Sequence, residues 1–153
     1  GFFMMIVAGF GWAKPVPVNP NYFKKPKEGM AVTALAGPVS NFLLALLLLL
    51  AARLVYVRAV VTGTLPETLF SFLVNTASLS VGLGLFNLVP VPPLDGSKVA
   101  AVLLPDRAYN WLMRYEQLGM VLLVVIISVG IGSNALDAAI RWVFELFCRI
   151  VGF

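Results

Sequence analysis

The chain has 153 residues, of which 60 % are hydrophobic and only 12 % are charged. Soluble domains carry about 25 % charged and about 45–50 % apolar residues. So few charged residues cannot cover the surface of a soluble globular protein. The composition therefore predicts a membrane protein surrounded by lipid. The net charge of +4 is not gathered into a long basic run. Nucleic-acid binding, which needs clustered cations, is therefore not expected.

Two residue types narrow the possible chemistry. The sequence contains no histidine, so these 153 residues alone cannot supply a histidine base or a histidine metal ligand. The single cysteine, Cys148, cannot form an internal disulfide and is interpreted as a small buried hydrophobe. The apolar start at Gly1 lacks the features of a signal peptide. We expect the chain to be part of a longer protein with one or more helices upstream of Gly1.

The segment at residues 11–20 is predicted to be extended. Prolines at positions 15, 17 and 20 fix φ and remove amide donors, so residues 11–20 cannot form a helix. A hydrophilic loop with three lysines follows at 24–27. If that loop is cytoplasmic, successive crossings place Arg107 and Arg114 on the same side as the lysines, and Arg53 and Arg58 on the other side. The basic residues then lie mostly inside, as the positive-inside rule expects.

Three runs without charge are long enough to cross a hydrocarbon core, which takes about 20 residues. They cover 29–52, 68–94 and 117–136, and they predict transmembrane helices at 32–58, 67–88 and 117–134. No internal repeat accompanies them, which weighs against a transporter built from inverted repeats.

The last segment is amphipathic. Asp137, Arg141, Glu145 and Arg149 recur every four residues with alternating sign. This spacing predicts i,i+4 ion pairs on one helical face. The helix could lie in the membrane interface or turn its charged stripe toward a polar partner, but a solvated edge on a peripheral helix is the favoured interpretation.

The most informative stretch is FNLVPVPPLDGS at residues 86–97. Three prolines break a long apolar helix, and an acidic residue, Asp95, follows the break. An ionisable side chain at membrane depth is expensive and indicates function. The alternative is that Asp95 lies at the membrane surface and caps the helix that begins near Ser97. These residues alone leave the two interpretations nearly equal.

A second group of residues, AGPVSN, occupies positions 36–41 at the start of the first long helix. Gly37 and Pro38 allow close backbone approach and a local bend. Asn41 places an amide with donors and an acceptor in an apolar helix. The plainer interpretation, favoured on the residues alone, is a helix-packing site with Asn41 hydrogen-bonded between helices.

Taken together, GWAKPVPV at 11–18, GPVSN at 37–41 and NLVPVPPLDG at 87–96 resemble the site-2 protease family. The motifs occur in the family's order over about residues 1–120, and the third is the most specific. The family consists of zinc metalloproteases that cut substrates within the membrane. The resemblance implies a zinc cofactor and a transmembrane protein or peptide as substrate.

The resemblance also implies roles for individual residues. Asp95 matches the family's third zinc ligand, whereas the other two ligands and the general base belong to an H-E-x-x-H motif that this sequence lacks. Asn41 matches an Asn that contacts substrate or the developing oxyanion, and Asn87 is assigned to orienting the broken helix or a substrate strand. The segment at residues 11–23 resembles a membrane-associated hairpin that pairs with an unwound substrate.

We therefore expect an all-α, multi-pass membrane protein in the cytoplasmic membrane of a prokaryote. Residues 1–153 would form one partial, membrane-embedded protease-like domain of about four helices, in which residues 67–104 form a discontinuous helix around a break at Pro90–Gly96. The leading hypothesis is a zinc endopeptidase whose general base lies upstream of Gly1. A catalytically inactive relative that binds transmembrane segments is the alternative, and a channel with Asp95 in its ion pathway is a third. Substrate identity and oligomeric state stay open.

Overall fold

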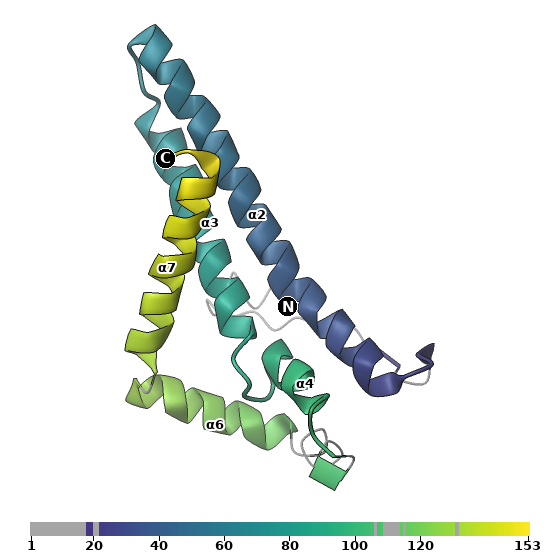
Figure 1. The fold of residues 1–153 in the computed structure, drawn as a ribbon. Coiled ribbons are helices and arrows are strands. Elements are labelled where there is room, and N and C mark those ends of the chain that lie inside the picture. The colour runs from purple at the N-terminus through teal and green to yellow at the C-terminus, as the bar shows by residue number, and fades with distance from the viewer. Residues whose placement is uncertain (1–17, 20–21, 106, 109–113, 115, 131) are drawn as a thin grey trace, which may run out of the picture.

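The computed structural model describes residues 18–19, 22–105, 107–108, 114, 116–130 and 132–153. Five helices fill most of this part of the chain, and no strand occurs in it (Figure 1). They are α2 (Pro26–Thr62), α3 (Glu67–Asn87), α4 (Asp95–Ala101), α6 (Glu116–Val129) and α7 (Ser133–Val151). The predicted all-α fold is confirmed. The hairpin predicted at residues 11–23 lies largely outside the described residues.

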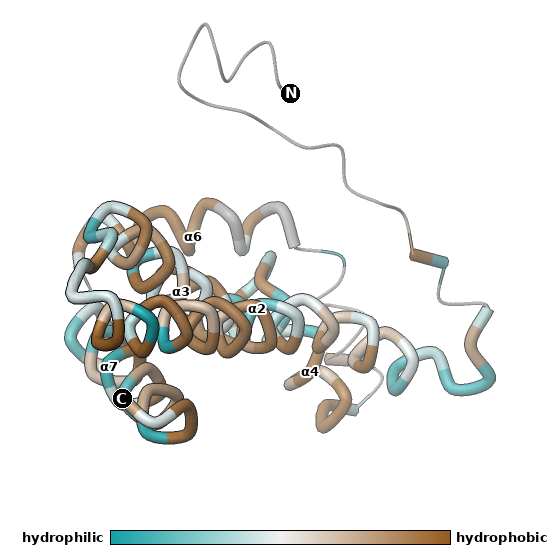
Figure 2. The backbone as a smooth tube through the Cα atoms, turned by 90° about the horizontal axis from the view of Figure 1, so that it is seen from above, coloured by the Kyte–Doolittle hydropathy of each residue, from teal (hydrophilic) through white to brown (hydrophobic). Residues whose placement is uncertain are grey.

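The two longest helices form an antiparallel pair (Figure 1). At 1.5 Å per residue, α2 is about 55 Å long and α3 about 31 Å, against a hydrocarbon core of about 30 Å. Both are long and apolar enough to cross a membrane, which confirms the spans predicted at 32–58 and 67–88. Hydrophilic residues precede α2, and its middle is strongly hydrophobic (Figure 2). Helix α2 ends at Gly63, whose φ of 72° is left-handed and whose N–H donates to the Ala59 carbonyl.

A small core joins this pair to α7. Ala45 and Leu49 of α2 and Ala77 and Val81 of α3 are fully buried or nearly so. The apolar side of α7 packs against them through Ile140, Val143, Phe144 and Phe147, among others. The rings of Phe42 and Phe147 meet edge to face, with centroids 6.2 Å apart. Small residues on the facing helices permit this close approach, as is usual between helices in membranes.

The third span, predicted as a helix at 117–134, does not form one continuous helix. Helix α6 ends at Val129, and at about 21 Å it is too short to cross the hydrocarbon core alone. Gly130 and Gly132 adopt φ values of 73° and 82°, which an α-helix cannot continue through. The chain bends by 86° between residues 121–129 and α7.

The charged stripe of α7 is exposed, as the favoured interpretation held. The i,i+4 ion pairs predicted for it are not formed, because no two of its charges come within 4.0 Å. The ion pair that the structure does give for its described residues joins Lys25 and Glu28, at 2.9 Å. The hydrogen bond that Lys25 donates to the Glu28 carboxylate raises the pKa of Lys25 above its usual value. The charges of α7 thus lie on an exposed face, away from the face that packs on the core.

Candidate functional site

Asp95 is the first residue of α4, immediately after the break that follows α3. Seven residues, 88–94, separate the two helices, which confirms the predicted discontinuity. Leu94, not Asp95, is the N-cap residue, and no side chain caps this helix. Ser97 instead donates its hydroxyl to the Leu94 carbonyl at 2.7 Å. The interpretation of Asp95 as a helix cap is therefore wrong, and among the described residues its carboxylate makes no hydrogen bond or ion pair.

The Asp95 carboxylate lies against Gly37 of α2. A Cβ built on Gly37 would stand 3.1 Å from Oδ2 of Asp95. Helix α4 packs on α2 at this level, near the N-terminal end of α2 (Figure 1). The fold thereby joins the motif at 37–41 to the motif at 87–96. A carboxylate with no hydrogen-bond or ion-pair partner in the described part of the chain is thus held beside an apolar helix. An ionisable group in such surroundings is energetically costly and therefore indicates a functional site.

The break is a compact series of turns. Val89 donates to the Phe86 carbonyl at 3.1 Å, and Leu94 donates to the Val91 carbonyl at 2.9 Å. Gly96 presses on this loop, because a Cβ there would overlap the Leu88 carbonyl and stand 2.7 Å from the Val89 oxygen. Only glycine fits so close to two backbone carbonyls. The position of Asp95 is therefore set by backbone-to-backbone packing.

Helix α6 supports the same loop from another side. A Cβ on the buried Gly119 would stand 2.5 Å from Cβ and 2.7 Å from the carbonyl oxygen of Pro92. The sequence reasoning missed both Gly96 and Gly119 as structural contributors to the site. The Asp-Gly pair carried a signal for Gly96, since a glycine inside a helix start often marks a close approach. Gly119 is a single glycine in an apolar run and carried no comparable signal.

The two predicted substrate-contact residues lie on the helices α2 and α3, and neither is hydrogen-bonded to Asp95 in the structure. Asn41 follows Gly37 by one helical turn, so both lie on the same face of α2. Asn87 is the last residue of α3, at the start of the break. Both side chains are half-buried. Among the described residues, neither amide makes a hydrogen bond, so the interhelical bond considered for Asn41 is not formed.

The donor set fits one part of a catalytic zinc site. Such sites use three protein ligands and keep a position for water. Within the described part of the chain, no three His, Cys, Asp or Glu side chains gather to hold a metal. The carboxylate of Asp95 is an unengaged oxygen donor in a fixed position, and the whole sequence contains no histidine. Asp95 can therefore serve as one ligand, but these residues alone do not complete a zinc site.

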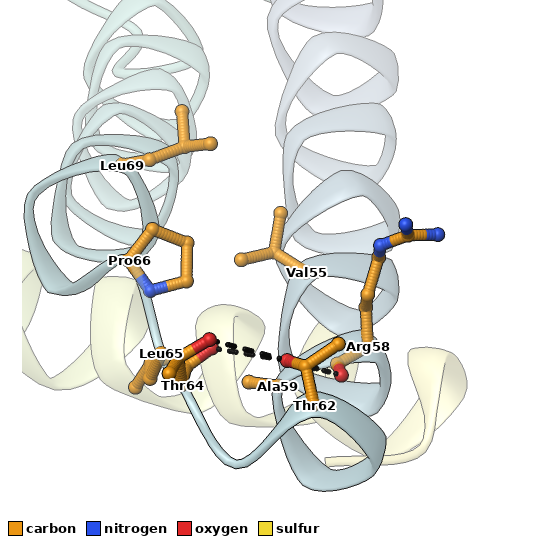
Figure 3. A pocket seen from close by; sticks show the side chains of 8 residues that line it. All are labelled: Val55, Arg58, Ala59, Thr62, Thr64, Leu65, Pro66 and Leu69. Carbon is orange, nitrogen blue, oxygen red and sulfur yellow. Dashed lines mark hydrogen bonds between the residues drawn. The ribbon is translucent and has the colours of Figure 1, made fainter.

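Cavities also occur in the described part of the chain. A cavity of about 500 Å³ opens at the turn between α2 and α3, where Val55 faces Pro66 and Leu69 and the Thr62 hydroxyl lies 3.4 Å from the Thr64 carbonyl (Figure 3). This turn is at the opposite end of α2 from Gly37, roughly 37 Å along the helix, so it takes no part in the site.

The second cavity, of about 270 Å³, borders the break. Its lining is almost entirely apolar and comes from the loop, α6 and the start of α7: Phe86, Val89, Val91, Leu123, Ile126, Ile127, Gly130, Gly132, Ser133 and Leu136. Val89 lines it and also contacts Gly96. The cavity therefore adjoins the loop that holds Asp95.

Comparison with known proteins agrees with this arrangement. The family model described as "Peptidase family M50" matches residues 55–130, which include α3, the break and Asp95. A protein of Bacillus subtilis (strain 168) named "Putative zinc metalloprotease YwhC" is 37 % identical over 142 residues. That alignment covers 89 % of this chain and 63 % of the relative, so the chain spans less than two thirds of that protein's length. No solved structure matches the chain. The motifs, their meeting at Asp95 and these matches together show that the chain belongs to peptidase family M50, the site-2 protease family.

Proposed function

We propose that this chain is part of an intramembrane zinc endopeptidase that hydrolyses peptide bonds of transmembrane substrates. The family and the name of the relative support a metalloprotease. One observation of the structure carries the finer proposal. Asp95 is the first residue of a helix in an interrupted membrane segment. Its carboxylate lies against Gly37 and has no hydrogen-bond or ion-pair partner among the described residues. A group so placed is available to bind a metal.

Zinc bound there would lower the pKa of a bound water toward neutrality and polarise the peptide carbonyl. Asp95 would hold the metal at the level of the break through its carboxylate. The two further ligands and the general base would come from an H-E-x-x-H helix outside these 153 residues, because the sequence contains no histidine.

The remaining site residues would act on the substrate. Asn41 lies on the face of α2 that carries Gly37, so its amide could donate to a substrate carbonyl oxygen as negative charge develops there. Asn87 could orient a substrate strand at the start of the break. The non-helical backbone at 88–94 fits a site that admits water, since such backbone at membrane depth must be buried in protein or line a hydrated cavity.

The whole protein would then be a multi-pass protein of a prokaryotic cell membrane. Its partners would be lipid and transmembrane proteins or peptides. Two helices of the described part already meet the length and apolarity that a membrane span requires.

The decisive experiment compares Asp95→Ala with Asp137→Ala in the full-length protein purified in detergent. Zinc content is measured by elemental analysis, and cleavage of a transmembrane peptide is followed with and without a chelator. Asp137 is an exposed acidic residue of α7 and provides a matched control. We expect Asp95→Ala to lose more than about 100-fold in cleavage rate, beyond what the loss of a supporting residue around a metal costs. Wild-type cleavage by Asp95→Ala would refute the ligand assignment.

The same experiment tests an inactive, substrate-binding relative. The absence of histidine from these residues is the observation that favours it. If the full-length wild-type protein bound no zinc and cleaved nothing while still capturing a transmembrane peptide, that alternative would replace the endopeptidase proposal.

A further inference from the structure

Gly37 leaves open the space beside the Asp95 carboxylate. An added Cβ would stand 3.1 Å from Oδ2, which is closer than nine in ten real Cβ contacts. Among the described residues outside the adjoining part of α2, the carboxylate oxygen is the one atom that this Cβ would have within 4 Å. By contrast, a Cβ on Gly82 of α3 would meet only Cδ1 of Ile140, at an ordinary 3.5 Å.

The backbone of α2 is held in place at Gly37. Ser40 donates its hydroxyl to the Gly37 carbonyl at 2.7 Å. Pro38 is fully buried, and Ala34, one turn earlier, is 6 % exposed. Because the buried face of α2 runs through these positions, the helix cannot easily move away from α4 at this level.

The start of α4 is equally constrained. Gly96 contacts the carbonyls of Leu88 and Val89, and Ser97 is buried and bonded to the Leu94 carbonyl. Neither backbone can therefore retreat when a side chain is added at residue 37. The Asp95 side chain must take up the change by moving its carboxylate a few tenths of an ångström.

We propose that Gly37 is a positioning residue, which sets where the Asp95 carboxylate stands for metal binding. This inference rests on the proposed function, in which Asp95 is a zinc ligand. Metal–ligand distances are fixed to about 0.2 Å, so a shift of a few tenths matters to a bound metal. It matters little to the metal-free fold, because among the described residues the carboxylate has no hydrogen bond or ion pair to lose.

The test uses Gly37→Ala and Gly82→Ala in the full-length protein, with zinc affinity measured by competition against a chelating dye. Thermal unfolding of the metal-free protein is measured in parallel. Both substitutions add one methyl group to a helix interior, but Gly37 precedes Pro38, whose ring disfavours the helical conformation for a preceding residue that carries a Cβ. Gly37→Ala therefore gains less helix propensity than Gly82→Ala. We expect Gly37→Ala to weaken zinc binding about 10- to 100-fold, as the loss of supporting residues around metals does. Its metal-free melting temperature should fall below that of Gly82→Ala only by this local proline effect, so the variant is still folded where zinc binding is measured. Gly37→Val should bind zinc more weakly still.

Two results would overturn the inference while leaving the proposed function intact. One is zinc affinity of Gly37→Ala within twofold of wild type, in a protein whose Asp95→Ala variant has lost zinc. The other is a loss of zinc binding by Gly37→Ala only at temperatures where the metal-free variant is already unfolded, which would assign Gly37 to helix stability. Wild-type protein that binds no zinc would overturn the proposed function and, with it, this role for Gly37.

Discussion

Gly96→Ala probes the contact between α4 and the loop that precedes it. The new methyl group would overlap the Leu88 carbonyl and stand 2.7 Å from the Val89 oxygen, whereas real Cβ atoms stay at least 3.0 Å from such neighbours. The obstacles are backbone atoms, so no side-chain rotation relieves them. The loop at 88–94 or the start of α4 must move.

The size of that movement sets the expected loss of activity. The Val89 oxygen alone demands 3.0 − 2.7 = 0.3 Å, and the overlap with Leu88 demands more. Asp95 is the adjacent residue and moves with the backbone. A displacement of about 1 Å at a reacting centre costs on the order of 100-fold, so we expect a fall in cleavage rate of about 10- to 100-fold. Overpacking costs about 1–3 kcal/mol, and the helix propensity of alanine offsets up to about 1 kcal/mol of it.

The assay is cleavage of a transmembrane peptide by full-length protein in detergent, alongside thermal unfolding. Gly82→Ala is the control, since its methyl group meets only ordinary contacts. Gly96→Ala should lose activity at temperatures where it is still folded. Activity and melting temperature equal to those of Gly82→Ala would show that the break does not hold Asp95 through Gly96.

Further predictions concern the two ends of α7. Gly132→Ala forces a non-glycine residue to a φ of 82°, and among the described residues no atom beyond its chain neighbours and its own helix lies within 4 Å of the new methyl group. The substitution should destabilise the protein by about 1–2 kcal/mol through backbone strain alone. An unchanged melting temperature would show that the bend before α7 does not need this conformation. Arg53→Met removes a guanidinium carbon that lies 5.8 Å from the Tyr56 ring centroid and 5.6 Å from that of Phe153. We expect a loss of about 0.5–2 kcal/mol in thermal unfolding, and Arg58→Met, whose side chain stacks on no described ring, should lose less; equal losses would contradict the cation–π assignment.

Much of the architecture follows from local properties of the sequence. The membrane environment, the two long spans and the break after Asn87 depend on composition, on charge-free length and on prolines, and each of these acts within a few residues. The motifs at 37–41 and 87–96 likewise indicated the family before any geometry was known. The structure confirmed both spans and the break, and extended α2 beyond each predicted end.

The bend after α6 could not be predicted in the same way. A glycine in an apolar run is compatible with a continuous transmembrane helix, and residues 117–136 carry no charge to interrupt one. Gly130 and Gly132 take left-handed φ values where the chain turns by 86° into α7, whose apolar face packs on the α2–α3 core. That packing involves residues distant in sequence, so a local pattern does not contain it.

The same distinction between local sequence and tertiary packing applies to the candidate site. The sequence alone determined which residues have the chemistry: one carboxylate after a proline-broken helix, two amides, and no histidine. Only the tertiary structure decided that Asp95 is not a helix cap, that its carboxylate faces Gly37, and that Gly96 and Gly119 clamp the loop behind it. The physical reason is that the chemistry of a side chain depends on its residue type alone. The space open to a carboxylate depends instead on which backbone segments the fold brings close to it.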